Sequence, residues 1–295
     1  MHQLLIWIVE PGFLSSTPVR VAMGVGGATA VLSAVVGVFT VVRGQSFAGH
    51  ALTDVSASGG SGALFVGLDP LVGFLVFGVV AAGLMDSIGV RRVRGRDLAT
   101  GVVLGASIGF TALILYFDTT AKATTGAVQQ ILFGSIFTVD TTTLPVVAVL
   151  SAVTLGSMAL LYRPLLLSAV SPDMAVARGV PERLVGALFL AALAVAVGLS
   201  ALAIGAVLST ALLIGPAASA LRLTKRLWAT LVVAAGIGVV ATWLGILLAY
   251  DSYYWDAGHR GFPVSFFVVT ILFVAYLASG LSGRRRPGAR RRDQA

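Results

Sequence analysis

The sequence predicts an all-α, polytopic integral membrane protein. Hydrophobic residues make up 57% of the 295 residues and charged residues only 11%, and the mean hydropathy is +0.97. These values are typical of helices that dissolve in lipid, and they exclude a soluble globular core. The chain contains no cysteine, which also excludes disulfides and thiolate metal ligands.

Basic residues indicate which segments are cytoplasmic. Most of the 20 lysines and arginines lie in clusters between long apolar runs, which is the pattern of cytoplasmic loops in membrane proteins. We therefore attribute the net charge of +8 to membrane topology and expect no nucleic-acid partner. The clusters are Arg43, Arg91–Arg96, Arg163, Arg178 with Arg183, Arg222–Arg226, and the tail 284–295.

An even number of spans must separate any two cytoplasmic clusters, and this parity predicts about nine transmembrane helices, within a range of about eight to ten. The N-terminus is then outside and the C-terminus cytoplasmic, and no removable signal peptide is indicated. We expect residues 1–283 to form a single transmembrane permease domain, followed by a disordered basic tail over 284–295. The expected spans are 17–42, 48–66, 71–90, 98–117, 142–162, two within 183–222 that break near Ser200, 227–249 and 263–282.

The acidic residues support this orientation, because most of them fall on segments assigned to the outside. The segment 118–140 is too polar at its start to span the bilayer, and its later apolar part suits the interface or a re-entrant segment. The acidic residues assigned to the outside are Glu10, Asp69, Asp118, Asp140, Asp251 and Asp256.

Two ionisable residues, His50 and Asp54, interrupt the second expected span. Residues four apart share one face of a helix, and an aspartate inside a membrane span costs about 2.5–3.5 kcal/mol on insertion scales. Three interpretations remain open on spacing alone. The pair could stabilise helix packing, relay protons in a secondary transporter, or line a path for zinc, manganese or iron, which imidazole and carboxylate ligands suit.

Four segments, in this order along the chain, resemble the membrane permease subunit of the bacterial zinc/manganese/iron ABC importers. They are VVRGQSFAGHALTD (41–54), LFGSIFTVD (132–140), SPDMAVARGVP (171–181) and GAVLSTALLIGPAASALRL (205–223), and the resemblance covers about residues 12–282. It implies a type II-like ABC importer permease that dimerises in the bacterial cytoplasmic membrane. It also implies a transported divalent metal and no permanently bound cofactor.

The resemblance assigns roles to individual residues. It implies that His50 and Asp54 contact the metal, and that Ser209 and Pro216 belong to a pore helix. The family typically has aspartate directly after the glycine and histidine four residues later, whereas here the order of the two residues is reversed.

The segment 171–181 predicts a short cytoplasmic helix, because Pro172 and Asp173 favour a helix start and Gly179 favours its end. The resemblance implies that this helix docks on an ATPase through Ser171, Pro172, Asp173, Ala175 and Gly179. The chain has no G-x-x-x-x-G-K-[ST] phosphate loop, so we expect ATP hydrolysis on a separate ATPase subunit and no enzymatic activity here. An extracytoplasmic metal-binding protein is the other implied partner.

Other functions remain open at this stage. The chain could be the permease of a siderophore or cobalamin ABC importer, although a bulky ligand does not call for an imidazole and a carboxylate. It could also be a proton-coupled secondary transporter that uses His50 and Asp54 as a relay, or a membrane scaffold without transport activity.

Overall fold

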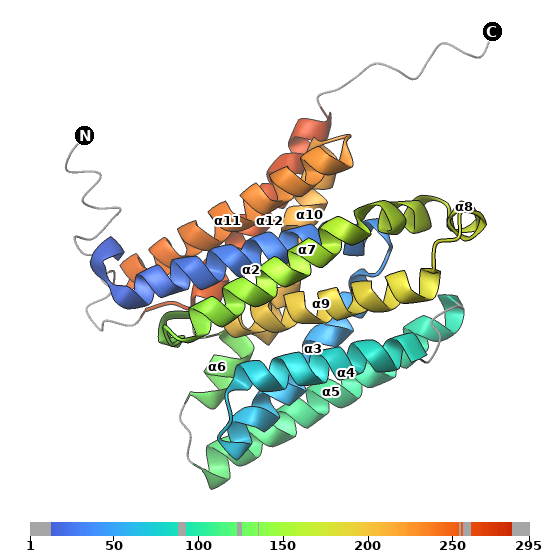
Figure 1. The fold of residues 1–295 in the computed structure, drawn as a ribbon. Helices are drawn as coiled ribbons and strands as arrows, with labels where there is room; N and C mark the ends of the chain where they lie inside the picture. Colours follow the sequence, from blue (N-terminus) through green and yellow to red (C-terminus); the bar gives the residue numbers. More distant parts are fainter. Residues whose placement is uncertain are drawn as a thin grey trace, which may run out of the picture.

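The computed structural model describes residues 13–87, 93–122, 126–134, 136–253, 255 and 261–284, and every regular element in these ranges is a helix. The long helices lie side by side in one bundle (Figure 1), which confirms the all-α prediction for the described part of the chain. The long helices are α2 (Thr17–Val42), α3 (Ser46–Val66), α4 (Pro70–Ser87), α5 (Val93–Ala121), α7 (Thr143–Val170), α9 (Glu182–Ile204), α10 (Ala206–Leu223), α11 (Leu227–Ser252) and α12 (Val264–Arg284). The short ones are η1 (Phe13–Ser15), α6 (Ala127–Phe133), η2 (Ile136–Thr138) and α8 (Pro172–Ala177).

Seven of the described helices are long and apolar enough to cross a membrane, namely α2, α5, α7, α9, α10, α11 and α12. The other two expected spans correspond to α3 and α4. Helix α4 is a shorter apolar helix over Pro70–Asp86. Helix α3 contains His50, Asp54 and many glycines and serines, which lower its hydropathy.

Helices α2 and α9 lie at the centre of the bundle. In each of them 72% of the most apolar window is buried, against 17% in α5 and 22% in α7. The exposed residues of α5 and α7 are largely apolar, for example Phe110 and Leu160, which suits contact with acyl chains.

The central helices pack closely through small residues. A Cβ on Gly37 of α2 would lie 1.9 Å from the carbonyl oxygen of Leu213 in α10, so only glycine allows these two backbones to touch. Ser33 of α2 and Ser200 of α9 are buried and share a hydrogen bond with an Oγ–Oγ distance of 2.5 Å. Small and hydroxylated side chains therefore hold α2 against both neighbours.

The break between the two spans of 183–222 lies at Gly205 and not near Ser200 as the sequence analysis expects. Gly205 has a φ of +84°, and a Cβ there would lie 2.2 Å from the carbonyl oxygen of Leu132. Gly134, with a φ of +80°, approaches the same turn from the other side. The turn is thus fixed by a tertiary contact between backbones, which requires glycine at both positions.

Two helices continue further than the expected spans, and each of them buries an aspartate near its end. Helix α5 continues to Ala121 and α11 to Ser252, so Asp118 and Asp251 are in helices and only 1% and 7% exposed. The hydroxyls of Thr119 and Thr120 donate to carbonyls in the preceding turn of α5, which helps polar residues continue the helix. Glu10, Asp256 and the tail 285–295 lie outside the described residues.

The short helices lie at opposite ends of the bundle, with α6 at one end and α8 at the other (Figure 1). We refer to these as the α6 end and the α8 end. Helix α6 and η2 are too short to cross a bilayer, and α6 packs against α3, α5, α9 and α10. Segment 118–140 therefore contributes no span beyond the end of α5, as the sequence analysis predicts.

Candidate functional site

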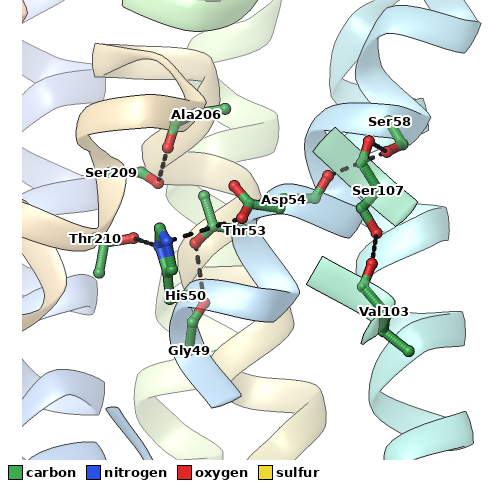
Figure 2. Close-up of polar contacts among 10 residues, drawn as sticks. All are labelled: Gly49, His50, Thr53, Asp54, Ser58, Val103, Ser107, Ala206, Ser209 and Thr210. Atoms are coloured by element: carbon green, nitrogen blue, oxygen red, sulfur yellow. Dashed lines mark hydrogen bonds and ion pairs between the residues drawn. The ribbon is translucent and has the colours of Figure 1, made fainter. Parts of the chain in front are cut away.

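Helix α3 places His50 and Asp54 on one face. It starts at Ser46, after a tight turn in which Gly44 has a φ of +64°, so His50 lies about one helical turn into α3. The His50 Nε2 atom is 3.8 Å from the Asp54 Oδ2 atom (Figure 2). The His50 side chain is 44% exposed and that of Asp54 13%, so the pair is neither sealed in dry packing nor fully open.

Helix α10 supplies a third polar group. The Nδ1 atom of His50 lies 3.2 Å from the Thr210 hydroxyl, and Figure 2 shows the imidazole between Thr210 and Asp54. A hydroxyl can donate or accept, so it can hold the ring in either neutral tautomer. Sequence reasoning missed Thr210.

The predicted pore residues on α10 lie elsewhere. Ser209 is fully buried, and its hydroxyl donates to the carbonyl of Ala206 at 3.0 Å within the same helix (Figure 2). Pro216 is also buried, inside α10. The partly exposed face of α10 that includes Thr210 is formed by Val207, Thr210, Ile214 and Ala218, at helical spacing.

Asp54 has spare capacity to bind a cation. Its Oδ2 atom has no hydrogen-bond donor among the described residues. An imidazole nitrogen and a carboxylate oxygen are both ligands for divalent first-row metals. Within the described residues no group of three or more His, Cys, Asp and Glu is placed to hold a metal ion. The pair therefore suits brief contact with a passing ion better than permanent binding.

Helix α3 is tied to α5 by hydroxyl groups one turn beyond Asp54. The Ser58 hydroxyl lies 2.9 Å from both the Ser107 carbonyl oxygen and the Thr111 hydroxyl, and 3.2 Å from the Asp54 carbonyl oxygen. On another face, Gly59 packs against Gly73 of α4, where a Cβ would lie 2.3 Å from the Gly73 carbonyl oxygen. The contacts to α5 and α4 on either side hold α3 in place.

Helix α6 packs against α3, α5 and α10 at the α6 end of the bundle. Ala127 and Ile131 are buried in a cluster that includes Leu115 of α5, Phe74 of α4 and Ala206 of α10. Because α6 contacts α3, α5 and α10 together, it closes the region between them at this end.

A separate cavity of about 750 Å³ opens at the α6 end. The described residues that line it include no histidine, aspartate or glutamate, so it lacks the ligand types of the pair. Its lining includes Ser16, Gln129, Gln130, Phe137, Tyr250 and Phe262. His259, the histidine nearest to this part of the sequence, lies outside the described residues.

Asp140 is a contrasting carboxylate in the loop before α7. It is exposed and accepts the N–H of Thr142 at 3.3 Å and the hydroxyl of Thr141 at 3.2 Å. These hydrogen bonds, led by that of Thr142, lower the pKa of the Asp140 carboxyl below its ordinary value. Asp140 therefore already has hydrogen-bond donors, whereas the Oδ2 atom of Asp54 has none among the described residues.

The predicted short helix is present as α8. Pro172 occupies its first turn, Asp173 lies where an acidic side chain suits the helix dipole, and Gly179 has a φ of +72° just beyond its end. Ala175 is fully buried, whereas the apolar side chains of Met174 and Val176 are 50% and 62% exposed. The α8 end thus presents an exposed apolar surface on a defined helix.

Comparison with known proteins gives a consistent match. The sequence model of the ABC 3 transport family matches residues 17–280. The manganese transport system membrane protein MntC of Halalkalibacterium halodurans is 28% identical over 253 residues, covering 86% of this chain and 84% of that protein. The manganese import system permease protein ScaB of Streptococcus parasanguinis is 28% identical over 224 residues, covering 76% of this chain and 79% of that protein.

The fold also matches a solved structure. One chain of PsaBC from Streptococcus pneumoniae, in complex with Fab, aligns with a TM-score of 0.75 and 22% identity, covering 95% of each chain. At this identity the similarity establishes the fold.

Proposed function

The chain belongs to the ABC 3 transport family, and from that premise we propose that it is the permease subunit of an ATP-driven importer of a divalent transition metal. The observation that carries the proposal is the polar group in which His50 lies between Asp54 and Thr210. A neutral imidazole and a carboxylate at membrane depth offer two ligands to a cation that has lost part of its water shell.

The protein is a multi-pass protein of the cytoplasmic membrane. We propose that α3 and α4 also cross the bilayer, because the 21 residues of α3 extend over about 31 Å. This gives about nine spans, with the α8 end cytoplasmic and the α6 end outside. The basic residues Arg43, Arg178 and Arg222 then lie at or near the cytoplasmic surface, in agreement with the positive-inside rule.

Manganese is the proposed cargo. Relatives from two genera carry manganese in their names, and Mn²⁺ accepts both carboxylate and imidazole ligands. Zinc and iron accept the same ligands, so the donor set allows all three metals. The metal is the transported substrate in this proposal, and the chain contributes ligands to it without chemical change.

We propose that a second copy of this chain completes the path. An imidazole that is 44% exposed in a single chain would face acyl chains unless another subunit covers it. The partly exposed face of α10 beside it, defined above by Val207, Thr210, Ile214 and Ala218, would form part of that interface. An ATPase subunit would dock on α8, and an extracytoplasmic metal-binding protein would deliver the ion at the α6 end.

The experiment that tests the function is metal accumulation by cells with and without this gene, measured for manganese, zinc and iron together. A manganese deficit in the cells that lack the gene is expected, and its absence for all three metals would contradict the proposal. Uptake by vesicles that contain this chain without an ATPase, driven by a proton gradient alone, would instead indicate a secondary transporter.

Replacing Thr210 with valine should weaken metal transport without abolishing it. The substitution keeps the side-chain shape but removes the hydroxyl that contacts His50 Nδ1, so the ring loses its orientation. We expect the KM for Mn²⁺ to rise roughly tenfold in ATP-driven uptake by the reconstituted complex. Thr210→Ser keeps the hydroxyl and should retain a KM close to that of the wild type.

Replacing Met174 and Val176 with glutamate should weaken binding of the ATPase and thereby reduce metal uptake. Both side chains are exposed on α8, and charges there would disrupt an apolar contact with the ATPase. We expect about a tenfold loss of ATPase co-purification and of metal uptake. The matched control is Leu68→Glu, an exposed apolar residue at the opposite end, which should keep the ATPase bound.

A further inference from the structure

A second carboxylate is buried in the α6 end of the bundle. Asp118 of α5 is only 1% exposed, and its Oδ2 atom has no hydrogen-bond donor among the described residues. Aspartate is rarely buried to this extent without a partner, because removing an ionised carboxylate from water is costly.

The face of α5 that carries Asp118 identifies its surroundings. Thr111, Leu115 and Asp118 follow one another at helical spacing and share one side of the helix. Thr111 contacts the Ser58 hydroxyl of α3 at 2.9 Å, and Leu115 packs with the buried residues of α6. Asp118 therefore lies where α3, α5 and α6 meet.

The basic residue closest in sequence does not neutralise Asp118. Lys122 follows directly after the last residue of α5, but its ammonium donates to the carbonyl oxygen of Phe65 and sits 4.4 Å from the centre of the Phe65 ring. The described residues form no ion pair with Asp118; the single pair found among them is that of His50 and Asp54. The carboxylate is thus left without a cation from the described chain.

We propose that Asp118 is a second binding group for the transported cation, on the outer side of the His50–Asp54 pair. The inference rests on the proposed function, since it takes the cargo to be a divalent metal. The Lys122 contact places this part of α5 level with Phe65, which is about 16 Å along α3 from Asp54. A cation entering at the α6 end would meet the carboxylate of Asp118 before that of Asp54.

Successive weak sites are what rapid conduction requires, because an ion must both enter and leave each of them. Between the two carboxylates, the hydroxyls of Ser58, Ser61 and Thr111 are the polar groups on the facing sides of α3 and α5. Asp118 is only 1% exposed in this conformation, so metal could reach it only after a movement that opens a route to its carboxylate.

The test uses the permease reconstituted with its ATPase and binding protein in proteoliposomes. Asp118→Asn keeps the size of the side chain and removes its charge. We expect the KM for ATP-driven Mn²⁺ uptake to rise about tenfold. Asp140→Asn, an exposed carboxylate at the same end, is the matched control and should leave the KM unchanged. A wild-type KM for Asp118→Asn would overturn the inference.

Thermal unfolding of the purified complex separates this role from a structural one. Without added metal, Asp118→Asn should melt no lower than the wild type, because it removes an uncompensated buried charge. Added Mn²⁺ should raise the Tm of the wild type more than that of the variant. A variant that melts well below the wild type, or that gains as much from Mn²⁺, would also overturn the inference.

The outcomes distinguish this inference from the proposed function. If the wild-type complex transports no divalent metal, the proposed function fails. A different result contradicts only the role of Asp118. In that case the wild type transports Mn²⁺, Asp54→Asn loses this transport, and Asp118→Asn retains it.

Discussion

A permease that carries both His50→Ala and Asp54→Ala should lose ATP-driven metal uptake by about 100-fold or more. Among the described residues of one chain, His50 and Asp54 are the two strong ligands at this level, 3.8 Å apart on α3. A loss of about 1.4 kcal/mol per ligand already corresponds to a tenfold weaker interaction, and the two losses together give the expected effect. The initial rate of Mn²⁺ uptake by proteoliposomes with the complete complex measures it.

A swapped variant is the sharpest control for this prediction. Combining His50→Asp with Asp54→His restores the order that the sequence analysis takes as typical of the family, and keeps one imidazole and one carboxylate on the same helical face. We expect this variant to recover most of the uptake lost in the double alanine variant. If the double alanine variant keeps more than about half of the wild-type rate, the pair does not contact the cargo.

Gly37→Ala should strongly destabilise the core of the bundle. The added methyl carbon would lie 1.9 Å from the carbonyl oxygen of Leu213, so α2 and α10 must separate. Overpacking of this kind costs about 3 kcal/mol of the free energy of unfolding, which exceeds the roughly 1 kcal/mol that alanine gains over glycine in a helix. Leu213 lies one turn from Thr210, so the shift would also disturb the contact with His50.

The thermal stability of the purified complex checks this expectation. Gly236→Ala in α11 is the matched control, because nothing lies within 4 Å of the position that its Cβ would take. We expect Gly236→Ala to melt at the wild-type temperature or slightly above it, and Gly37→Ala to melt several degrees lower. Equal melting temperatures for the two variants would contradict the close packing of α2 on α10.

The positions of the helices could be predicted because they depend on local properties of the sequence. Apolar runs of bilayer length, separated by arginines, locate most helix ends within about five residues, although α7 continues to Val170, eight residues beyond the expected end of its span. The turn before Pro70 and the helix that starts at Pro172 follow from turn and cap residues in the same way.

The features that sequence reasoning missed depend on contacts between distant segments. Gly205 ends α9 because Gly134 and Leu132 approach its backbone, and the uniformly small and apolar sequence around it carries no signal of that approach. The burial of Asp118 likewise carries no signal in the sequence, since it depends on the segments that pack around the end of α5.

For the candidate site, the sequence identifies the two ionisable residues but not the residue of α10 that contacts them. His50 and Asp54 stand out because ionisable groups are rare in spans. Thr210 does not, since a threonine in an apolar helix is common and its role depends on which face of α10 meets α3. The spacing of Val207, Thr210, Ile214 and Ala218 becomes meaningful only when the structure shows that this face is partly exposed.

The central claim is that the His50–Asp54 pair contacts the transported metal. Pulsed electron paramagnetic resonance of Mn²⁺ bound to the purified, nucleotide-free complex tests it most directly, because a coordinated imidazole nitrogen couples measurably to the manganese spin. We predict a nitrogen coupling in the wild type that disappears in His50→Ala, with weaker Mn²⁺ binding. The same coupling and affinity in both proteins would contradict the claim.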